Sequence, residues 1–268
     1  MHASSTEPAD WAAASGGFRE TVERYFADRG HDPAAAHVQA TVRTNTELVP
    51  RRGEVLVELL AALGGSTLEG ARVVEAGSGF GALAGYLAWR YSPRQVMAFD
   101  IRQDYVESAR RSAAELGVGS RLLYETGDMR DFAAIRDGSA DVVVLNNAFI
   151  YLATRADMNR ALSALARVLR PGGLALFYHA NKWSLREPFT KDPLIHLLPP
   201  ALADRIANVT GWTHNHGRVR LLSPPEMRRR LGRAGFRDVR VGGYANGRVV
   251  TGRQAYLATF YGTVGRRR

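Results

Sequence analysis

Apolar residues change their spacing several times along the chain, from a helical period to short continuous runs and back. Apolar positions three or four residues apart indicate amphipathic helices, and short apolar runs rich in β-branched residues indicate buried strands. The predicted helices cover about 18–28, 34–48, 53–63, 80–91, 103–116, 155–169 and 224–234. The predicted strands cover about 73–76, 95–99, 121–125, 141–145, 174–178, 236–243 and 253–262.

From residue 73 to residue 178 the predicted strands and helices alternate. Such alternation predicts an α/β fold, in which a doubly wound and mostly parallel sheet carries helices on both faces. Ligands of such sheets bind beyond the carboxyl ends of the strands. We therefore expect a site where five predicted strands end, at Gly77, Asp100, Asp128, Asn147 and His179.

Two segments outside the alternating region break the pattern. Residues 1–15 are predicted to form a flexible tail, and residues 180–223, with four prolines, are longer than a usual strand-to-helix connection. The helices before the first strand either form a lid or cover the edge of the sheet. The predicted organisation is a tail and helical lid over 1–52, followed by one domain over 53–268 with a substrate-shaping insertion at about 180–223.

Three alternate glycines, Gly77, Gly79 and Gly81, follow Glu75 between a predicted strand and a predicted helix. Glycine allows a tight turn and a close approach of the backbone to a ligand, and the next helix directs its first N–H groups at that ligand. One interpretation is the dinucleotide fingerprint of an NAD-type oxidoreductase, because two of the glycines and Ala82 fit it. A second is the loop of another nucleotide-type cofactor, and a third is a tight turn that binds nothing.

Three further motifs follow the glycines in order. Asp100 lies at the tip of the second strand, where a carboxylate can hold both hydroxyls of a ribose. Asp128 and Met129 follow the third strand, and the sequence LRPGG precedes the fifth. Together with the acid-x-G-x-G-x-G pattern that begins at Glu75, these motifs resemble the class I S-adenosylmethionine (SAM) dependent methyltransferases. The resemblance covers about residues 53–180, and 224–262 more loosely.

The resemblance implies a cofactor, an architecture and a set of binding residues. SAM is the expected methyl donor, and S-adenosyl-L-homocysteine is the expected product. The family architecture is a seven-stranded sheet with an antiparallel edge strand, and an acid after the third strand accepts a hydrogen bond from the adenine amino group. The residues expected at the cofactor are Glu75, Gly77, Ser78, Gly79, Gly81, Asp100, Ile101, Asp128, Met129 and Asn146.

Methyl transfer is an in-line displacement, so the enzyme aligns donor and acceptor and often removes a proton from the acceptor. His179 is the candidate general base, because histidine titrates near neutral pH; the alternative is a structural histidine. Asn147 is the second catalytic candidate, and its alternative is a turn residue. No metal site is expected. The candidate substrate-binding residues are Tyr151, Trp183, His214 and His216.

Composition and charge narrow the function further. The absence of cysteine excludes disulfides and thiolate nucleophiles, and no apolar run approaches the length of a membrane span. We expect a cytoplasmic protein. The formal charge of +10 is concentrated at one end, because residues 201–268 hold 14 arginines and 3 acidic residues. This segment is either a solvated, arginine-rich face or a surface that attracts an acidic substrate, a phosphate or a membrane.

Three classes of function compete. The expected one is O- or N-methylation of a small molecule, such as a natural product, a sugar or a lipid-linked intermediate, because the lid and the insertion would enclose a pocket. The alternative is a nucleic-acid methyltransferase that uses the arginine-rich segment. Residues 146–149 read NNAF and lack the prolines of enzymes that methylate a base amino group, so that chemistry is not expected. The third class binds SAM without catalysis. A homo-oligomer is left open.

Overall fold

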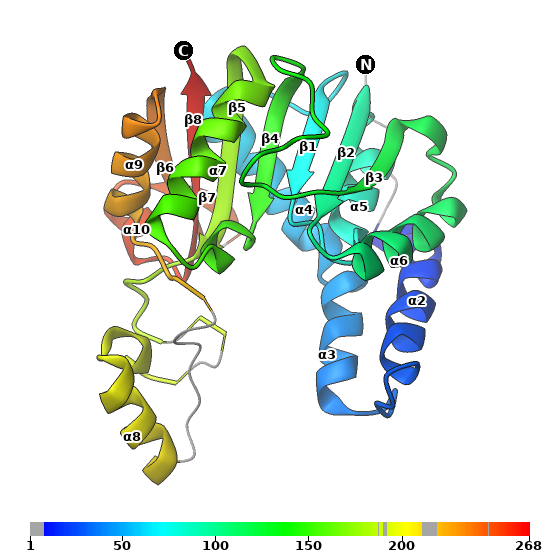
Figure 1. Ribbon diagram of the computed structural model, residues 1–268, viewed down its shortest axis with the longest axis horizontal. Helices are drawn as coiled ribbons and strands as arrows, with labels where there is room; N and C mark the ends of the chain where they lie inside the picture. The colour runs from blue at the N-terminus through cyan, green and yellow to red at the C-terminus, as the bar shows by residue number, and fades with distance from the viewer. Residues whose placement is uncertain (1–7, 187, 190–191, 211–218, 246) are drawn as a thin grey trace.

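Five parallel strands form the half of the sheet that the alternating sequence predicts. They are β1 (Arg72–Ala76), β2 (Gln95–Asp100), β3 (Leu122–Thr126), β4 (Ala140–Asn146) and β5 (Leu169–Ala180). Their order is β3-β2-β1-β4-β5, so the chain changes direction across the sheet between β1 and β4 (Figure 1). Such a switch point is where doubly wound sheets bind ligands. The computed structural model describes residues 8–186, 188–189, 192–210, 219–245 and 247–268.

Three antiparallel strands complete the sheet on the β5 side. β8 (Phe260–Arg267) pairs with β5, β6 (Phe236–Ala245) pairs with β8, and β7 (Arg248–Thr251) forms the edge beyond β6. The predicted α/β class with a mostly parallel sheet is confirmed. The antiparallel edge is also as predicted, but the sheet has eight strands, so the predicted number of seven is wrong.

The strand predicted over 253–262 is also wrong in its first half, which forms the short helix α10 (Arg253–Leu257). Gly252, with φ 62°, turns the chain out of β7 into this helix. The buried Ala255 then packs over Gly243, where a Cβ atom would lie only 3.1 Å from the Ala255 Cα. The missing side chain of Gly243 therefore leaves the room that α10 occupies.

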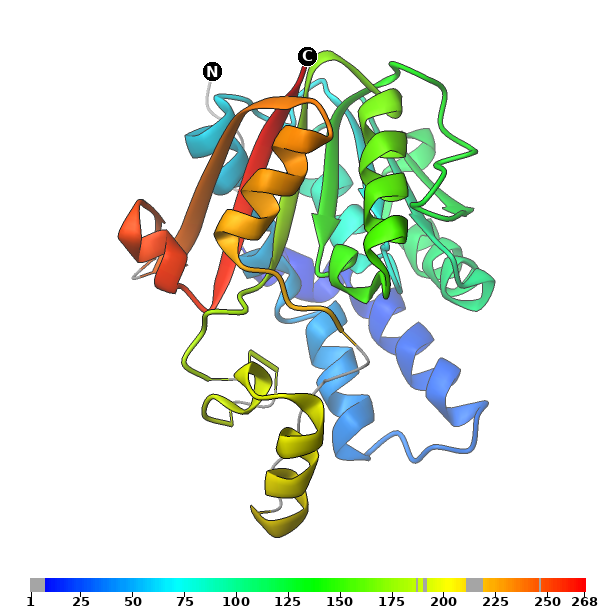
Figure 2. The ribbon, with the colours of Figure 1, turned by 60° about the vertical axis from the view of Figure 1, so that its left-hand side comes forward.

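Helices cover both faces of the sheet (Figure 2). α4 (Val49–Leu59), continued by the π-helical turn η1 (Leu60–Gly64), lies on one face with α5 (Ala82–Arg90) and α6 (Gln103–Ala113); α7 (Arg155–Val168) and α9 (Pro224–Arg233) lie on the other. The central strand β4 is apolar on both sides. Val142 and Val144 belong to the core under the first group of helices, and Val143 and Leu145 to the core under the second. This is the pattern of a fully covered parallel strand.

The N-terminal segment is folded where the structure describes it. Helix α1 (Pro8–Ala14) carries Trp11, which is 1% exposed. The Trp11 Nε1–H donates to the Thr46 carbonyl at 3.1 Å, and its ring meets Tyr86 edge-on with 5.1 Å between ring centres. The predicted flexible tail is therefore wrong for residues 8–14, because one tryptophan fixes the segment to the core. Residues 1–7 lie outside the described residues.

Two helical arms extend beyond the carboxyl ends of the parallel strands (Figure 1). One consists of α2 (Gly16–Ala27) and α3 (Ala36–Asn45), and the other contains α8 (Pro200–Thr210) from the predicted insertion. The first arm has its own small core, which includes Val22, Val38 and Phe80. Among the described residues, no helix combines the length and the apolar character needed to cross a membrane.

Candidate functional site

The glycine loop after β1 is held by backbone hydrogen bonds to the neighbouring strand. The N–H groups of Gly77 and Ser78 both donate to the Phe99 carbonyl, at 2.8 and 3.1 Å. Gly77, Gly79 and Gly81 all have positive φ, between 55° and 78°, a conformation that other residues adopt only at a cost. The alternate glycines are therefore required by the backbone path of this loop.

The three glycines meet different surroundings. A Cβ atom at Gly77 would lie 2.4 Å from the Ala148 Cβ, and one at Gly81 would lie 2.5 Å from the Tyr124 ring. These two positions are closed by the protein itself, and the Gly81 carbonyl also accepts a hydrogen bond from the Tyr124 hydroxyl at 2.7 Å. A Cβ atom at Gly79 would meet no atom within 4 Å. Of the three, only Gly79 leaves open space above the loop for a ligand.

Asp100, at the end of β2, is hydrogen-bonded to the same loop. Its Oδ2 accepts from the Gly79 N–H at 2.9 Å, and its Oδ1 accepts from the Arg102 N–H at 3.0 Å. Each carboxylate oxygen keeps a second lone pair, so the group remains able to accept from two hydroxyls. Ile101 follows with 63% of its surface exposed. This geometry is the one expected for an acid that holds a ribose beneath an apolar cover.

Asp128 lies at the same edge and is paired with Arg130. The Arg130 N–H donates to Oδ1 at 2.8 Å, and the Arg130 Nε donates to Oδ2 at 2.7 Å. Burial raises the pKa of Asp128, but these bonds outweigh it and hold the pKa below its usual value. Met129 lies close to the glycine loop, because its Cε would be 3.3 Å from a Cβ atom at Gly77. The adenine contacts predicted for these two residues stay predictions.

Three buried polar atoms around the loop have no hydrogen-bond partner among the described residues. They are Glu75 Oε2, Ser78 Oγ and Asn146 Oδ1. A buried polar atom without a partner costs about 1–3 kcal/mol, so such atoms are uncommon unless a ligand or water satisfies them. All three lie at the carboxyl ends of β1 and β4. These atoms fit a bound molecule that carries donor groups.

Glu75 and Arg52 are an acidic and a basic group that interact electrostatically at the end of β1. Glu75 is 2% exposed, and burial raises its pKa to about 8, although the charge of Arg52 and the Ala84 backbone N–H act to lower it. Burial also lowers the pKa of Arg52, against the opposing influence of Tyr178 and Glu75. Sequence reasoning missed Arg52, which lies just before the helix predicted over 53–63 and within the observed α4.

Asn147 supports the backbone between β4 and β5. It has φ 53°, its N–H donates to the Tyr178 carbonyl at 2.8 Å, and its Oδ1 accepts from the Ala180 N–H at 3.2 Å. These contacts match the turn role that asparagine commonly has. Its side-chain oxygen is already engaged by β5, so the geometry favours the turn role over contact with an acceptor.

His179 is buried in the sheet, with 1% of its surface exposed. Its ring centre lies 4.6 Å from that of Tyr261 on β8, and its Nε2 has no hydrogen-bond partner among the described residues. Burial lowers the pKa of His179 to about 4, although a contact with the Ala180 carbonyl acts in the other direction. His179 is therefore a weak base that is separated from solvent in this conformation, which argues against the predicted role as general base.

The predicted substrate residues are only partly described. Tyr151 is 63% exposed and Trp183 is 45% exposed, as expected for side chains open to a ligand at this edge. His214 and His216 lie outside the described residues. No cluster of three or more potential metal-ligating side chains occurs in the described part of the chain.

Comparison with known proteins separates the competing cofactor families. Residues 73–173 match a family model described as a methyltransferase domain. This region is a class I SAM-dependent methyltransferase domain. The cofactor is therefore SAM, and the interpretation as an NAD-type oxidoreductase is set aside. The matched region holds the glycine loop, Asp100, Asp128 and the LRPGG sequence, which are the motifs on which the resemblance was based.

Two of the curated relatives of this domain are, by name, O-methyltransferases. The chain is 32% identical over 190 residues to a malonyl-acyl-carrier-protein O-methyltransferase of Geobacter sulfurreducens, a match that covers 70% of this chain and 63% of that protein. It is 36% identical over 114 residues to a fatty-acid O-methyltransferase of Mycolicibacterium smegmatis, covering 42% of this chain and 39% of that protein. The chain thus spans less than two thirds of either relative.

A solved structure shares the fold across nearly the whole chain. A SAM-dependent methyltransferase from Thermotoga maritima superposes with a TM-score of 0.56 and 17% identity, covering 94% of this chain and 100% of that one. At this identity the likeness concerns the fold alone. It extends the agreement beyond residues 73–173 to the arms and the antiparallel strands.

Gly79→Ala tests whether the open space above the loop belongs to SAM. The left-handed φ of 55° makes alanine cost about 1 kcal/mol of unfolding free energy. Because the new Cβ enters the open space, we expect SAM affinity to fall about tenfold or more, as measured by calorimetry. Gly119→Ala is the matched control, with the same φ and the same open surroundings away from the loop. Equal SAM affinity of the two variants would contradict the assignment.

Glu75→Gln tests the pairing of this carboxylate with the SAM ammonium group. With a pKa of about 8, Glu75 is mostly protonated in the free protein at pH 6–7.5 and must release a proton to form the pair. We expect wild-type affinity to rise with pH over this range, by up to about tenfold per unit, and the variant to bind weakly at every pH. Calorimetry in two buffers of different ionisation enthalpy measures the proton release.

The same shift has a consequence for stability. The folded pKa of Glu75 lies above its unfolded value, so its contribution to stability is complete below about pH 4.5 and is lost as pH rises towards 8. Without SAM at pH 8, the unfolding free energy of Glu75→Gln, measured by urea unfolding, should therefore exceed that of wild type by up to about 5 kcal/mol. Glu125→Gln, an exposed carboxylate on β3, is the control. A Glu75→Gln variant that is less stable at pH 8 would argue against a strained, buried carboxylate.

Proposed function

We propose that this protein transfers the methyl group of SAM to a carboxylate oxygen of a small acyl acceptor and releases S-adenosyl-L-homocysteine. Two of the curated relatives are, by name, O-methyltransferases, one of a malonyl group and one of a fatty acid. Each of these acceptors offers a carboxylate. The burial of His179 is the structural observation that carries the choice of acceptor.

A carboxylate acceptor removes the need for a general base. It is ionised at neutral pH, with an ordinary pKa near 4, so no proton has to be removed before the oxygen attacks. SAM supplies a methyl group already activated by its positive sulfur. The protein then has to align the two partners, which alone lowers the barrier by several kcal/mol. A neutral and buried His179 is compatible with this reaction and unsuited to deprotonating a hydroxyl.

The residues at the edge of the sheet have separate tasks in this proposal. Asp100 would hold the ribose, and the Gly79 backbone would approach the cofactor closely. Glu75 and Arg52 would bind the ammonium and carboxylate groups of the methionine part, because they place opposite charges at one end of the loop. These contacts would fix the donor, so that only the acceptor remains to be positioned, at the ends of β4 and β5.

The α2–α3 arm would cover the cofactor, as the predicted lid. Tyr25 of this arm packs against Phe80 of the glycine loop, with 5.0 Å between ring centres, and Phe80 packs against Tyr105 at 4.6 Å. The Tyr25 hydroxyl also donates to Asp104 Oδ2 at 3.0 Å. The arm is thus attached to the two segments that follow β1 and β2. A cover placed there would exclude water from the reacting groups.

Methyl-labelled SAM tests the proposed activity. The purified protein is incubated with labelled SAM and host extract, and the label is counted in acyl, other small-molecule, protein and nucleic-acid fractions. We expect the label in acyl compounds, in a form that mild base hydrolyses as a methyl ester. Label in nucleic acid would favour the alternative that uses the arginine-rich segment. SAM binding without any label would favour a non-catalytic binding protein.

The His179→Phe variant tests whether His179 acts as a general base or as a structural residue of the core. Phenylalanine keeps the ring contact with Tyr261, and we expect activity within about twofold of wild type on the acceptor found by labelling. A loss of more than about a hundredfold with intact SAM binding would support the general base predicted from the sequence.

The same variant has a stability signature. The folded pKa of His179, about 4, lies below its unfolded value of 6.5, so stability is lost as pH falls through this interval. The wild type should lose up to about 3 kcal/mol of unfolding free energy between pH 6.5 and 4 through this residue, and His179→Phe should lack that part. Urea unfolding at both pH values measures the difference.

A further inference from the structure

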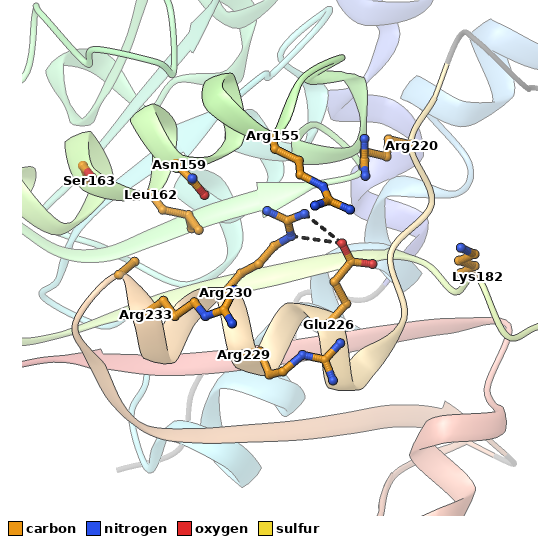
Figure 3. Close-up of a pocket in the computed structure, with 11 residues that line it drawn as sticks. Arg155, Asn159, Leu162, Ser163, Lys182, Arg220, Glu226, Arg229, Arg230 and Arg233 are labelled. Carbon is orange, nitrogen blue, oxygen red and sulfur yellow. Dashed lines mark hydrogen bonds and ion pairs between the residues drawn. The ribbon is translucent and has the colours of Figure 1, made fainter.

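A basic groove lies between α7 and α9, outside the cofactor loop (Figure 3). Its volume is about 870 Å³. Six cationic side chains and one carboxylate line it, and these are Arg155, Lys182, Arg220, Arg229, Arg230, Arg233 and Glu226. The only apolar side chains in its wall are Leu162 and Ala234. Small-molecule pockets are usually apolar with a few polar groups, and this groove has the opposite composition.

Most of the charge in the groove is not neutralised by the protein. Arg230 is paired with Glu226, with 2.8 Å between Nη2 and Oε1. The other five cations have no ion-pair partner in the part of the chain that the structure describes. Elsewhere on the same domain arginines are commonly paired, for example Arg110 with Glu125 at 3.0 Å. The groove therefore brings five uncompensated cations together in one hollow.

Cations that share one hollow repel each other unless an anion lies among them. Four of the five uncompensated cations in the groove are arginines, whose planar guanidinium groups bind phosphate oxygens through two parallel hydrogen bonds. Arg229 and Arg233 are four residues apart and so lie one turn apart on the same side of α9. The chemistry of the groove therefore fits a phosphate better than a neutral ligand.

The groove begins at the edge of the sheet where methyl transfer would occur. The Arg220 N–H donates to the carbonyl of Ile150, in the turn after β4, at 2.6 Å. Arg155 is the first residue of α7, and Lys182 follows the end of β5 by two residues. Arg233 lies at the far end (Figure 3). A molecule in the groove would thus extend from the carboxyl ends of β4 and β5 along α9.

We infer that this groove binds a phosphate-bearing part of the acceptor, so that the acceptor is held by its phosphate while its reactive end reaches the edge of the sheet. The inference deepens the proposed function and rests on it. It also gives a role to the arginine-rich C-terminal segment, which methyl transfer itself leaves unused. The phosphate could belong to a free metabolite or to an arm attached to a carrier protein.

Other anionic partners fit the groove less well. A membrane surface is flat and would reach the rim of a hollow between two helices, leaving its interior cations unpaired. Single-stranded nucleic acid is usually bound with aromatic side chains on which bases stack, and among the described residues none of the side chains that line this groove is aromatic. An acidic protein surface remains an outcome that the experiment must distinguish.

Inorganic pyrophosphate probes the groove directly. The full-length protein is titrated with pyrophosphate by calorimetry, with S-adenosyl-L-homocysteine present at saturation to fill the cofactor site. We expect R229A/R233A to bind pyrophosphate about tenfold or more weakly than wild type, and wild-type affinity to fall as salt rises. Arg228→Ala is the matched control, because Arg228 is exposed on the same helix and does not line the groove.

Two results of the titration would overturn the inference. One is equal pyrophosphate affinity of wild type and R229A/R233A, and the other is an equal loss in Arg228→Ala. SAM affinity is measured on each variant, and its retention in R229A/R233A shows that the fold and the cofactor site are intact. If the wild type itself did not bind SAM, this result would instead contradict the proposed function.

Labelled SAM and host extract then identify the source of the phosphate. Label in a small compound, abolished when the extract is first treated with phosphatase, indicates a free phosphorylated acceptor. Label in a protein fraction together with pyrophosphate binding indicates a phosphate on a carrier arm. In both cases R229A/R233A should incorporate about tenfold less label than wild type. Equal incorporation overturns the inference, and reduced protein labelling without any pyrophosphate binding indicates an acidic protein surface in place of phosphate.

Discussion

A single carbonyl oxygen, that of Phe99, accepts the two hydrogen bonds that fix the glycine loop. Because Gly77 and Ser78 both donate to it, the loop must close against the end of β2, and this closure requires positive φ at the glycines. The same closure brings the Gly79 N–H to Asp100 and places Phe80 beneath the α2–α3 arm. The position of Asp100, the open space above Gly79 and the attachment of the arm thus depend on one backbone geometry.

The parts of this arrangement that repeat along the chain could be predicted from the sequence. The strands and helices between residues 73 and 178 follow from alternating apolar periods, and the mostly parallel sheet follows from that alternation. Asp100 was placed correctly at the tip of β2 because a polar residue that ends an apolar run has to lie at the edge of the sheet. Local pattern was sufficient for these features.

Features that depend on contacts between distant segments were not predicted. Trp11 looked like part of a tail, because its partners Thr46 and Tyr86 lie 35 and 75 residues further along the chain. Helix α10 was predicted as strand, because its place depends on the absent side chain of Gly243. The importance of Arg52 depends on its electrostatic interaction with Glu75 of β1, which the local sequence does not reveal. In each case the deciding neighbour is remote in sequence and close in space.

His179 illustrates a related difficulty. Its position at the end of β5 suits a catalytic residue, but the two faces of a strand differ in what they meet. His179 lies beside its cross-strand partner Tyr261 of β8, which belongs to the second core. The sequence shows where a residue lies along a strand. Its neighbours on the same face of the sheet, however, depend on the order in which later strands join the sheet. The antiparallel strands, the least accurately predicted part of the fold, therefore decided how this residue is interpreted.

The small core of the α2–α3 arm has a further consequence. Val22, Val38 and Val42 have few apolar neighbours within the arm, and their cluster is completed by Phe80, which belongs to the glycine loop. A unit with so small a core of its own can open without unfolding the sheet. Whatever orders the glycine loop must then also order the arm, and an ordered arm must favour the loop to the same degree, because thermodynamic coupling is reciprocal. The arm and the loop thus behave as one cooperative element, although nearly sixty residues of sequence separate Val22 from Phe80.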